Sequence, residues 1–404
     1  MRQSLDKEKL SAVRIIAGEE ELLLSMPSAA PRMRFDERIC DFLDLFSKKI
    51  LADGRSRAFP DAVTLAFWMR KGNLNSLRKE LLTDPSCRYT GRGMVFHVSP
   101  SNVPLNCMYS LVTGLLAGNA NVVKIPSKDF EQLDLVCGAL RDALEEMEDI
   151  KPYIVLVRYG HEPEINEALS EHADGRVIWG GDQTIAEIRK APLPARAVEV
   201  DFADRYSLAV IDADRYLASE DRMAVANAFY NDTYLTDQNA CTSPRIVVWT
   251  GEHIAEAKEA FWEHLHELAS RRYALQPVQA VNKLTSGYLA AAVRGDVRKV
   301  PGPDNLITRI HTDRADRALM DLRDNSGYFY EYDCEDILEI RDLVDDTHCQ
   351  TIAYLGDSSI LEPLLSSGIK GVDRVVPLGH TMDWDFTWDG YQLMEMLVRV
   401  IRVR

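Results

Sequence analysis

Cys241 lies in a polar segment, residues 234–245, that leads into the strand-like run Arg245–Trp249. A cysteine is by default a small buried hydrophobe, but a nucleophilic thiol needs partial exposure and neighbours that stabilise its thiolate. Main-chain N–H groups and three polar side chains of the segment are suited to that role: Gln238, Asn239 and Thr242. The segment therefore predicts a presented, reactive thiol.

A second candidate is Asn102, in a loop that follows the strand-like run 94–98. Pro100 and Pro104 bracket it, and each proline fixes its own φ and biases the preceding residue away from helix. A stiffly held amide suits a developing oxyanion, where one preorganised donor lowers the barrier by about 3 kcal/mol. The alternative is that Asn102 only forms an Asx-turn.

A third segment, residues 115–127, reads as a helix end with a glycine cap, Gly118-Asn119, followed by a strand. That strand delivers Lys124 and Ser127 to its carboxyl edge, where ligands of open α/β sheets bind.

In this order the three segments resemble the aldehyde dehydrogenase superfamily, with its Pro-x-Asn-x-Pro, Gly-Asn…Lys and Gln-preceded cysteine motifs. Further details resemble the LuxC-type acyl-CoA reductases, the fatty-acid reductases of bacterial bioluminescence and their relatives. These details are the Asp-Gln-x-Ala-Cys-Thr-Ser-Pro run, the strand at 206–211, Gln350-Thr351, and the closing segments 371–379 and 388–391. The resemblance covers roughly residues 90–400.

The resemblance implies reduction of a fatty acyl thioester, acyl-CoA or acyl-carrier, to the aldehyde by NADPH through an acyl-cysteine. Cys241 and Asn102 are then the catalytic pair. The cofactor-binding residues that it implies are Ser99, Pro100, Lys124, Ser127, Gly180 and Gly181. An acyl-activating synthetase is the partner expected by analogy. A homo-oligomer is also expected, because the terminal strand of aldehyde dehydrogenases often pairs across subunits.

Cofactor choice depends on Ser127. In the family a glutamate three residues after the lysine accepts both ribose hydroxyls, and its charge would repel a 2′-phosphate. Ser127 removes that repulsion, while Lys124 and Lys128 add positive charge, so we expect NADPH to be preferred over NADH. The alternative is that Ser127 simply caps a helix beginning at Lys128.

No Gly-x-Gly-x-x-Gly follows the first strand, which the variant binding mode of the family explains. Its nearest substitute is Gly180-Gly181, where a strand ends and a helix begins, so a pyrophosphate could approach bare backbone. A simple turn is the alternative, and Asp182 departs from the small hydroxyl residue usual in the family.

Oxidising aldehyde dehydrogenases activate water with a glutamate in a Glu-Leu-Gly-Gly-Lys run. The equivalent region, 198–205, has lost both glycines, which leaves Glu199 as a base or as a surface strand residue. A missing base favours reduction over hydrolysis. The alternative functions are a non-acylating NAD(P)-dependent aldehyde dehydrogenase that uses Glu199, and a non-catalytic scaffold for an acyl-activating partner.

Strand-like and helical runs alternate from Met94 onward, which predicts an α/β fold with a doubly wound parallel sheet. The expected strands are 95–98, 122–125, 153–157, 177–179 and 197–200, and the expected helices are 105–117, 130–146, 164–171 and 184–190. Amphipathic stretches at 35–50 and 62–82 predict packing helices. With the resemblance, we predict an aldehyde-dehydrogenase-like chain of four parts: a helical N-terminal part of the cofactor domain (1–90), a dinucleotide-binding domain (91–203), a catalytic α/β domain (204–375) and a C-terminal tail with an oligomerisation strand (376–404).

The 404 residues contain 47 Lys and Arg against 63 Asp and Glu, a net charge of −16, which argues against nucleic acid and anionic membranes as partners. The cysteines are Cys40, Cys87, Cys107, Cys137, Cys241, Cys334 and Cys349. Their odd number and the lack of Cys-x-x-Cys spacing indicate neither a disulfide framework nor a metal site. The sequence shows no signal-peptide apolar region and no apolar run of about 18 residues. We therefore expect a soluble, cytoplasmic protein.

Overall fold

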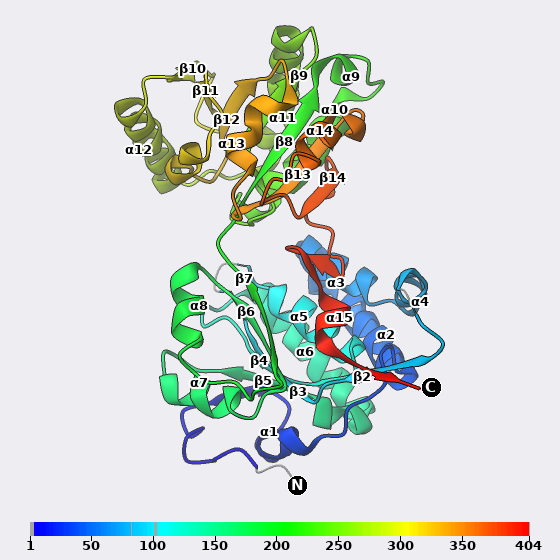
Figure 1. The fold of residues 1–404 in the computed structure, drawn as a ribbon. Helices are drawn as coiled ribbons and strands as arrows, with labels where there is room; N and C mark the ends of the chain where they lie inside the picture. The colour runs from blue at the N-terminus through cyan, green and yellow to red at the C-terminus, as the bar shows by residue number, and fades with distance from the viewer. Residues whose placement is uncertain (1–3, 82, 101–102, 404) are drawn as a thin grey trace. The chain divides into compact units, whose positions relative to one another are not determined.

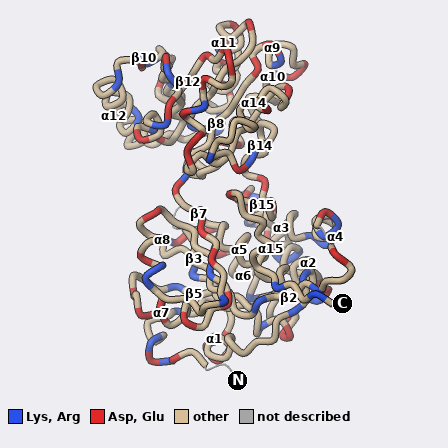
Figure 2. The backbone as a smooth tube through the Cα atoms, in the orientation of Figure 1, with Lys and Arg blue, Asp and Glu red and all other residues tan. Residues whose placement is uncertain are grey.

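The computed structural model describes residues 4–81, 83–100 and 103–403, and it divides into two compact units (Figure 1). Unit 1 comprises Met1–Ala203 and Tyr391–Arg404, and unit 2 comprises Asp204–Gly390. Lys and Arg residues are interspersed with Asp and Glu along the backbone of each unit (Figure 2). Among the helices of the described residues, none combines the length and the apolar character needed to cross a membrane.

Unit 1 is built on a six-stranded sheet in the order β1-β5-β4-β3-β6-β7, parallel except for β1. The strands are β1 (Arg14–Ala17), β3 (Met94–Val98), β4 (Ala120–Lys124), β5 (Ile154–Arg158), β6 (Gly175–Trp179) and β7 (Val198–Phe202). The helices are α1 (Glu20–Ser25), α2 (Glu37–Ala52), α3 (Pro60–Trp68), α4 (Lys71–Glu80), α5 (Asn106–Leu116), α6 (Glu131–Glu146), α7 (Pro163–Ser170), α8 (Asp182–Ile188) and α15 (Leu393–Leu397). The predicted doubly wound α/β fold is confirmed, with the predicted strands and helices present to within a few residues.

Alternate strand residues face opposite sides of this sheet, and helices cover both sides. Phe96 and Val122 pack with α7, α8 and the N-terminal segment in one buried cluster. Helices α5, α6 and α2 lie on the other face (Figure 1). Two layers of helices around near-continuous apolar strands are what a buried parallel sheet requires.

The single helix predicted for 62–82 is instead two helices, α3 and α4. Asn73 donates its side-chain amide to the Trp68 carbonyl at 2.8 Å, and the Lys71 N–H donates to Asp44 at 3.0 Å. These bonds satisfy main-chain groups at the break, so the chain turns between Trp68 and Lys71 without leaving them unpaired.

The C-terminal strand β17 (Val398–Arg402) pairs antiparallel with β2 (Cys87–Gly91) of the same chain. The alternating apolar and basic residues thus form a strand, while its role between subunits stays a prediction. A short strand, β16 (Tyr391–Gln392), precedes α15.

Unit 2 contains a seven-stranded sheet in the order β10-β11-β12-β9-β8-β13-β14, parallel except for β10. Its strands are β8 (Tyr206–Asp212), β9 (Pro244–Thr250), β10 (Val297–Val300), β11 (Thr308–Thr312), β12 (Tyr328–Asp333), β13 (Cys349–Leu355) and β14 (Arg374–Pro377), with the short β15 (Thr387–Trp388) near its end. Its helices are α9 (Ala213–Leu217), α10 (Arg222–Thr233), α11 (Ile254–Arg272), α12 (Pro277–Val293), α13 (Arg341–Val344) and α14 (Glu362–Leu365). Helices α9, α10 and α11 fill one face of the sheet, and α13, α14 and adjoining 3₁₀ turns fill the other.

Candidate active site

Cys241 lies in a turn between the 3₁₀ helix η4 (Tyr234–Thr236) and β9 of unit 2. The backbone before it is left-handed at two non-glycine residues, Asp237 (φ 53°) and Gln238 (φ 56°). Such residues are uncommon, and they persist only where the surroundings hold them, often at functional sites.

Gln238 is what holds this turn. Its amide donates to the carbonyls of Pro244 (3.0 Å) and Tyr328 (3.1 Å), and its oxygen accepts from the N–H groups of Gly327 (2.9 Å) and Tyr328 (3.1 Å). The side chain is buried and both ends of it are occupied. The prediction that Gln238 stabilises the thiolate is therefore wrong, because all its amide hydrogen bonds join the turn to β9 and β12.

The other two predicted thiolate partners are also engaged elsewhere. Asn239 donates to the Thr236 carbonyl at 3.1 Å and accepts from Asn325 at 2.7 Å. The Thr242 hydroxyl donates to the Met382 sulfur at 3.0 Å. The polar character of the segment thus builds the loop and does not solvate the sulfur.

The thiol of Cys241 is closely surrounded by protein, although the residue as a whole is partly exposed. Burial and the charge of Asp389 raise its pKa to about 12, against a hydrogen bond from Gln350 and the charge of Arg205, which lower it. Desolvation thus outweighs the groups that favour the thiolate, which include Gln350 and Arg205 but not the three side chains that the sequence suggested. The resting protein therefore holds Cys241 as a neutral thiol.

Gln350 and Asp389 are site residues to which the sequence assigned no role. Both stand in segments that carry the LuxC resemblance, and that was the only signal that could have found them. Gln350, at the start of β13, donates to the Asp389 carboxylate, and both residues are buried. Arg205 ion-pairs with Asp373 and lies 3.6 Å from Asp389 Oδ2.

Two further arginines lie near enough to Cys241 to interact with it electrostatically. They are Arg245 and Arg374, and a negative charge on the Cys241 sulfur would raise the pKa of each. Arg374 lies over the Trp388 ring, 4.1 Å from its centroid, and donates to the carbonyls of Thr381 (3.1 Å) and Asp383 (3.0 Å). Three arginine charges thus act on the Cys241 sulfur and would favour its thiolate form.

The residues predicted for the cofactor gather in unit 1 at the carboxyl edge of the sheet. The order β4-β3-β6 places the reversal of strand order between β3 and β6, where open α/β sheets bind ligands. Ser99 and Pro100 follow β3, Lys124 ends β4, and Gly180 and Gly181 follow β6. Among residues 4–81, 83–100 and 103–403, the buried Ser99 hydroxyl finds no hydrogen-bond partner, and a Cβ on Gly181 would meet no atom within 4 Å. An unsatisfied hydroxyl and open backbone at this edge fit a bound dinucleotide.

Lys124 is prepared for a polar ligand. Its ammonium donates to the Gly160 carbonyl at 2.9 Å and lies 4.0 Å from the centroid of the Tyr159 ring. Burial lowers its pKa, while the nearby Glu162 raises it. One carboxylate oxygen of Glu162 is buried and has no hydrogen-bond partner in the part of the chain that the structure describes. The sequence did not predict that Glu162 lies near Lys124.

Ser127 is exposed at the end of the same segment. The alternative in which it caps a helix starting at Lys128 is wrong, because α6 begins at Glu131 with Phe130 in the N-cap position. The hydroxyl is therefore not committed to that cap.

Glu199, the alternative base, is locked between two arginines of unit 1. Arg176 donates to it from Nε at 2.7 Å, and so does Arg189 at 2.7 Å. Burial raises the pKa of Glu199, but the hydrogen bonds from Arg189 and Arg176 outweigh this and hold it below its ordinary value. Glu199 is thus an ion-paired structural carboxylate, neither a loose surface residue nor a group poised to take a proton.

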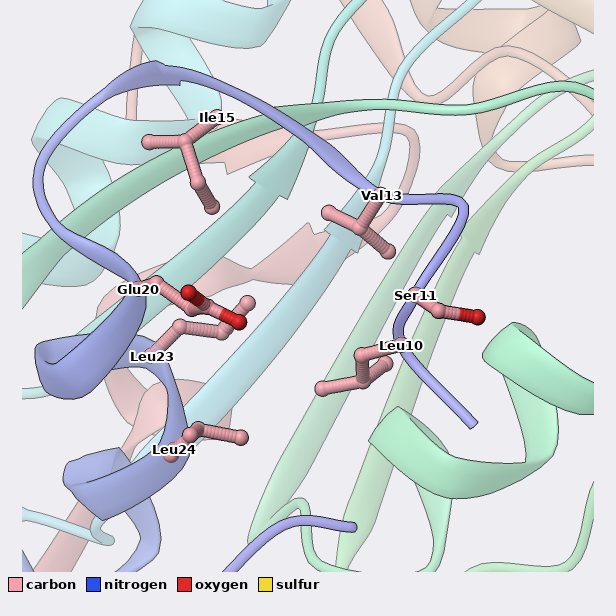
Figure 3. A pocket seen from close by; sticks show the side chains of 7 residues that line it. All are labelled: Leu10, Ser11, Val13, Ile15, Glu20, Leu23 and Leu24. Atoms are coloured by element: carbon pink, nitrogen blue, oxygen red, sulfur yellow. The ribbon is translucent and has the colours of Figure 1, made fainter. Parts of the chain in front are cut away.

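Asn102 lies outside the described residues, so its role as an oxyanion donor stays a prediction. A pocket in unit 1 is lined by residues of the N-terminal segment and α1 (Figure 3): Leu10, Ser11, Val13, Ile15, Glu20, Leu23 and Leu24. None of them is a predicted site residue, and the mostly apolar lining offers little to a phosphate.

Comparison with known families finds a match to "Acyl-CoA reductase (LuxC)" over residues 70–285. Long-chain acyl-protein thioester reductase of Photorhabdus luminescens is 26% identical over 181 residues, 43% of this chain and 35% of that protein. The enzyme of the same name from Aliivibrio fischeri is 26% identical over 165 residues, 40% of this chain and 33% of that protein. The matched region thus spans about a third of the length of these relatives.

Solved structures with a similar fold are aldehyde dehydrogenases. A 1-pyrroline-5-carboxylate dehydrogenase from Thermus with bound NAD has a TM-score of 0.63 at 13% identity, covering 99% of this chain and 86% of that one. Lactaldehyde dehydrogenase from Escherichia coli has a TM-score of 0.60 at 13% identity, covering 90% and 86%. At this identity the likeness establishes the aldehyde-dehydrogenase-like fold.

Proposed function

Because the chain belongs to the LuxC family of acyl-CoA reductases, we propose that it reduces a fatty acyl thioester to the aldehyde through an acyl group carried on Cys241. The observation that carries the proposal is the position of Cys241. It occupies a strained, firmly bonded turn and is faced by Gln350, Arg205 and Arg374. The family match also includes both this turn and Lys124.

In the first step the Cys241 sulfur attacks the acyl carbonyl. A carbon–sulfur bond to Cys241 forms, the bond to the donor thiol breaks, and the donor leaves with the proton that Cys241 gave up. Asn102 and the Cys241 main-chain N–H are the proposed donors to the oxyanion that forms on the way. Arg205 stabilises the sulfur while it is negatively charged.

A nicotinamide dinucleotide supplies a hydride when bound. The residues that would hold it are those at the carboxyl edge of unit 1: Ser99, Pro100, Lys124, Ser127, Gly180 and Gly181. The oxyanion left on the reduced acyl carbon re-forms a carbonyl as the bond to Cys241 breaks. The electron pair returns to sulfur, which leaves the aldehyde and a thiolate ready for another acyl group.

NADPH is the proposed donor, because Ser127 carries no charge against a 2′-phosphate and Lys124 adds a positive one. Glu162 works in the opposite direction, since it places a carboxylate near Lys124. Their balance sets the ratio between the two cofactors, which the Ser127 and Glu162 variants below measure.

Reduction is favoured over hydrolysis of the acyl-enzyme because Glu199 is ion-paired and its pKa lies below its ordinary value. A weakly basic carboxylate held by two arginines is poorly suited to activating water. The names of the curated relatives support an acyl group attached to a protein thiol as one donor.

The test is to incubate the protein with acyl-CoA of several chain lengths, and separately with an acylated carrier protein, in the presence of NADPH. The expected product is the aldehyde, formed in equal amount to the NADPH oxidised. Release of free acid without NADPH oxidation would contradict the proposal. So would conversion of an aldehyde and NAD(P) to free acid with no thiol acceptor, which would identify a non-acylating aldehyde dehydrogenase.

A further inference from the structure

Asp389 is a buried carboxylate with an unusual backbone. It lies just before the point where the chain returns to unit 1, has a φ of 50° and exposes only 4% of its surface. A left-handed, non-glycine residue whose charged side chain is buried is costly on two counts. Its surroundings must therefore hold it in place, and they do so through Gln350 and Arg205.

Gln350 is arranged in a way that leaves part of it unsatisfied. Its amide nitrogen donates to Asp389, and the Gln350 side chain is also close enough to Cys241 for its hydrogen bonding to lower the pKa of that thiol. Its carbonyl oxygen is buried and has no hydrogen-bond partner among the residues that the structure describes. Leaving a buried acceptor without a partner is energetically unfavourable. An amide turned by 180° could place its oxygen elsewhere, so something must enforce the present orientation.

The enforcing group is the Asp389 carboxylate. An ionised carboxylate only accepts hydrogen bonds, so it selects the nitrogen of Gln350 over the oxygen. The two amide hydrogens can then serve Asp389 and the Cys241 sulfur. In the turned amide the oxygen would face the sulfur, and its partial negative charge would oppose a thiolate.

We propose that Gln350 is a catalytic residue that donates its amide hydrogen to the Cys241 sulfur, and that Asp389 is a positioning residue that keeps the Gln350 nitrogen turned toward that sulfur. The inference rests on the proposed function, in which Cys241 is the nucleophile. Gln350 then acts twice: when the thiolate attacks the donor, and when the thiolate leaves the reduced acyl carbon. No proton is transferred to or from the amide in either step.

The charges that face Asp389 make this arrangement sensitive to pH. Burial raises the pKa of Asp389 to about 6, against the charges of Arg205 and Arg374 and the Gln350 hydrogen bond; Asp373 raises it further. Below about pH 6 a protonated Asp389 can donate to the free Gln350 oxygen, and the amide is then released to turn. The donation to sulfur is expected to be lost over the same pH range.

A purely electrostatic role for Asp389 predicts the opposite result. Its negative charge raises the pKa of Cys241, so charge alone makes neutralising Asp389 favourable for the thiolate. In the positioning account the change Asp389→Asn instead slows the thiol, because the new amide can donate to the Gln350 oxygen and turn it. The two accounts thus differ in sign.

The experiment measures the alkylation rate of Cys241 by iodoacetamide between pH 5 and 9, with peptide mass spectrometry to identify the modified residue. The full chain carrying Cys87→Ser is the background, since Cys87 is the other partly exposed cysteine. We expect Gln350→Met and Asp389→Asn each to slow alkylation about tenfold at pH 7.5. The control Asp373→Asn removes a carboxylate that also contacts Arg205 but leaves the Gln350–Asp389 bond, and it should change the rate less than threefold.

Faster alkylation of Asp389→Asn, or a wild-type rate in Gln350→Met, would overturn the inference. Thermal unfolding of each variant shows whether it is folded. Because Gln350→Met can also disturb packing, Gln350→Glu provides a second variant of similar shape, in which an acceptor replaces the donor. It should react still more slowly, and a wild-type rate there would also overturn the inference.

Alkylation needs neither acyl donor nor NADPH, so this outcome is separate from that of the proposed function. If the wild-type protein forms aldehyde but Gln350→Met is alkylated at the wild-type rate, only the proposed role of Gln350 is contradicted. If the Gln350 variants are alkylated more slowly but the wild-type protein makes no aldehyde, the role of Gln350 toward the thiol is supported and only the proposed reaction is contradicted.

Discussion

The two units differ in how the polar groups at their predicted site residues are hydrogen-bonded. At the carboxyl edge of the unit 1 sheet, some polar groups have no hydrogen-bond partner among the described residues, namely the Ser99 hydroxyl and one Glu162 oxygen, and the backbone at Gly181 is open. In the turn that carries Cys241 in unit 2, the side chains of Gln238, Asn239 and Thr242 are already hydrogen-bonded within the unit, and protein closely surrounds the sulfur.

This difference in hydrogen-bonding is consistent with a ligand-binding edge in unit 1 and a nucleophile in unit 2. A binding edge gains from open donors and acceptors, because the ligand satisfies them on arrival. A nucleophile that must be charged only during the reaction gains from a low-dielectric setting, in which a few fixed donors act strongly. Variants in the two regions should therefore fail differently, in cofactor selectivity for unit 1 and in turnover or stability for unit 2.

The largest effect is expected for Cys241→Ser. Turnover should fall by at least about 1000-fold, because a neutral serine hydroxyl without an adjacent base is a poor nucleophile. The dissociation constant for NADPH, measured by fluorescence titration, should stay within twofold of wild type. Cys87→Ser is the matched control and should keep full activity. If Cys241→Ser kept its turnover, unit 2 would not carry the nucleophile, and the contrast between the two units would be wrong.

Asn102→Ala should lower kcat roughly 100-fold with little change in cofactor affinity, because one oxyanion donor is worth about 3 kcal/mol. Steady-state kinetics with acyl-CoA as the varied substrate measures this. A loss of only a few-fold would return Asn102 to the role of a turn residue.

Gln238→Leu separates scaffold from chemistry within unit 2. It leaves main-chain groups of Pro244, Gly327 and Tyr328 unpaired, so the free energy of unfolding should fall by roughly 3 kcal/mol. Urea denaturation measures the change. Gln350→Met should lower it much less, because one of its polar atoms is already unsatisfied. Equal losses for the two glutamines would remove the distinction between them.

The smallest effects are expected in unit 1, on the ratio of kcat/KM for NADPH to that for NADH. Ser127→Glu should lower this ratio several-fold by repelling the 2′-phosphate, and Glu162→Gln should raise it. Ser127→Gln serves as the uncharged control of the same size. If neither Ser127→Glu nor Glu162→Gln changed the ratio, the 2′-phosphate would have to bind away from this edge.

Sequence patterns were sufficient for the fold of unit 1, and the strand order decides where the predicted cofactor residues lie. Alternating strands and helices predict a parallel sheet, and a parallel sheet brings the residues after β3, β4 and β6 to one edge. Glu162 escaped notice because it follows β5 in a loop with no motif, and only the fold brings it near Lys124.

In unit 2 the sequence predicted the nucleophile but not its neighbours. Local polarity pointed to Gln238, Asn239 and Thr242, whereas Gln350 and Asp389 come to the sulfur from β13 and from the end of the unit. These two residues lie more than a hundred positions from Cys241, so their contacts depend on packing, which no local pattern records. Packing also decided the role of Glu199, whose ion-pair partners Arg176 and Arg189 lie 23 and 10 positions away.

The central claim is that Cys241 carries the acyl group, and trapping that intermediate tests it most directly. The wild-type protein and Cys241→Ala are incubated with a long-chain acyl-CoA in the absence of NADPH, digested, and examined by mass spectrometry. One acyl group should appear on the wild-type peptide that contains Cys241, should be absent from the variant, and should leave as the aldehyde when NADPH is added. Acylation of another residue in both proteins, or an acyl-Cys241 that NADPH does not discharge, would contradict the account.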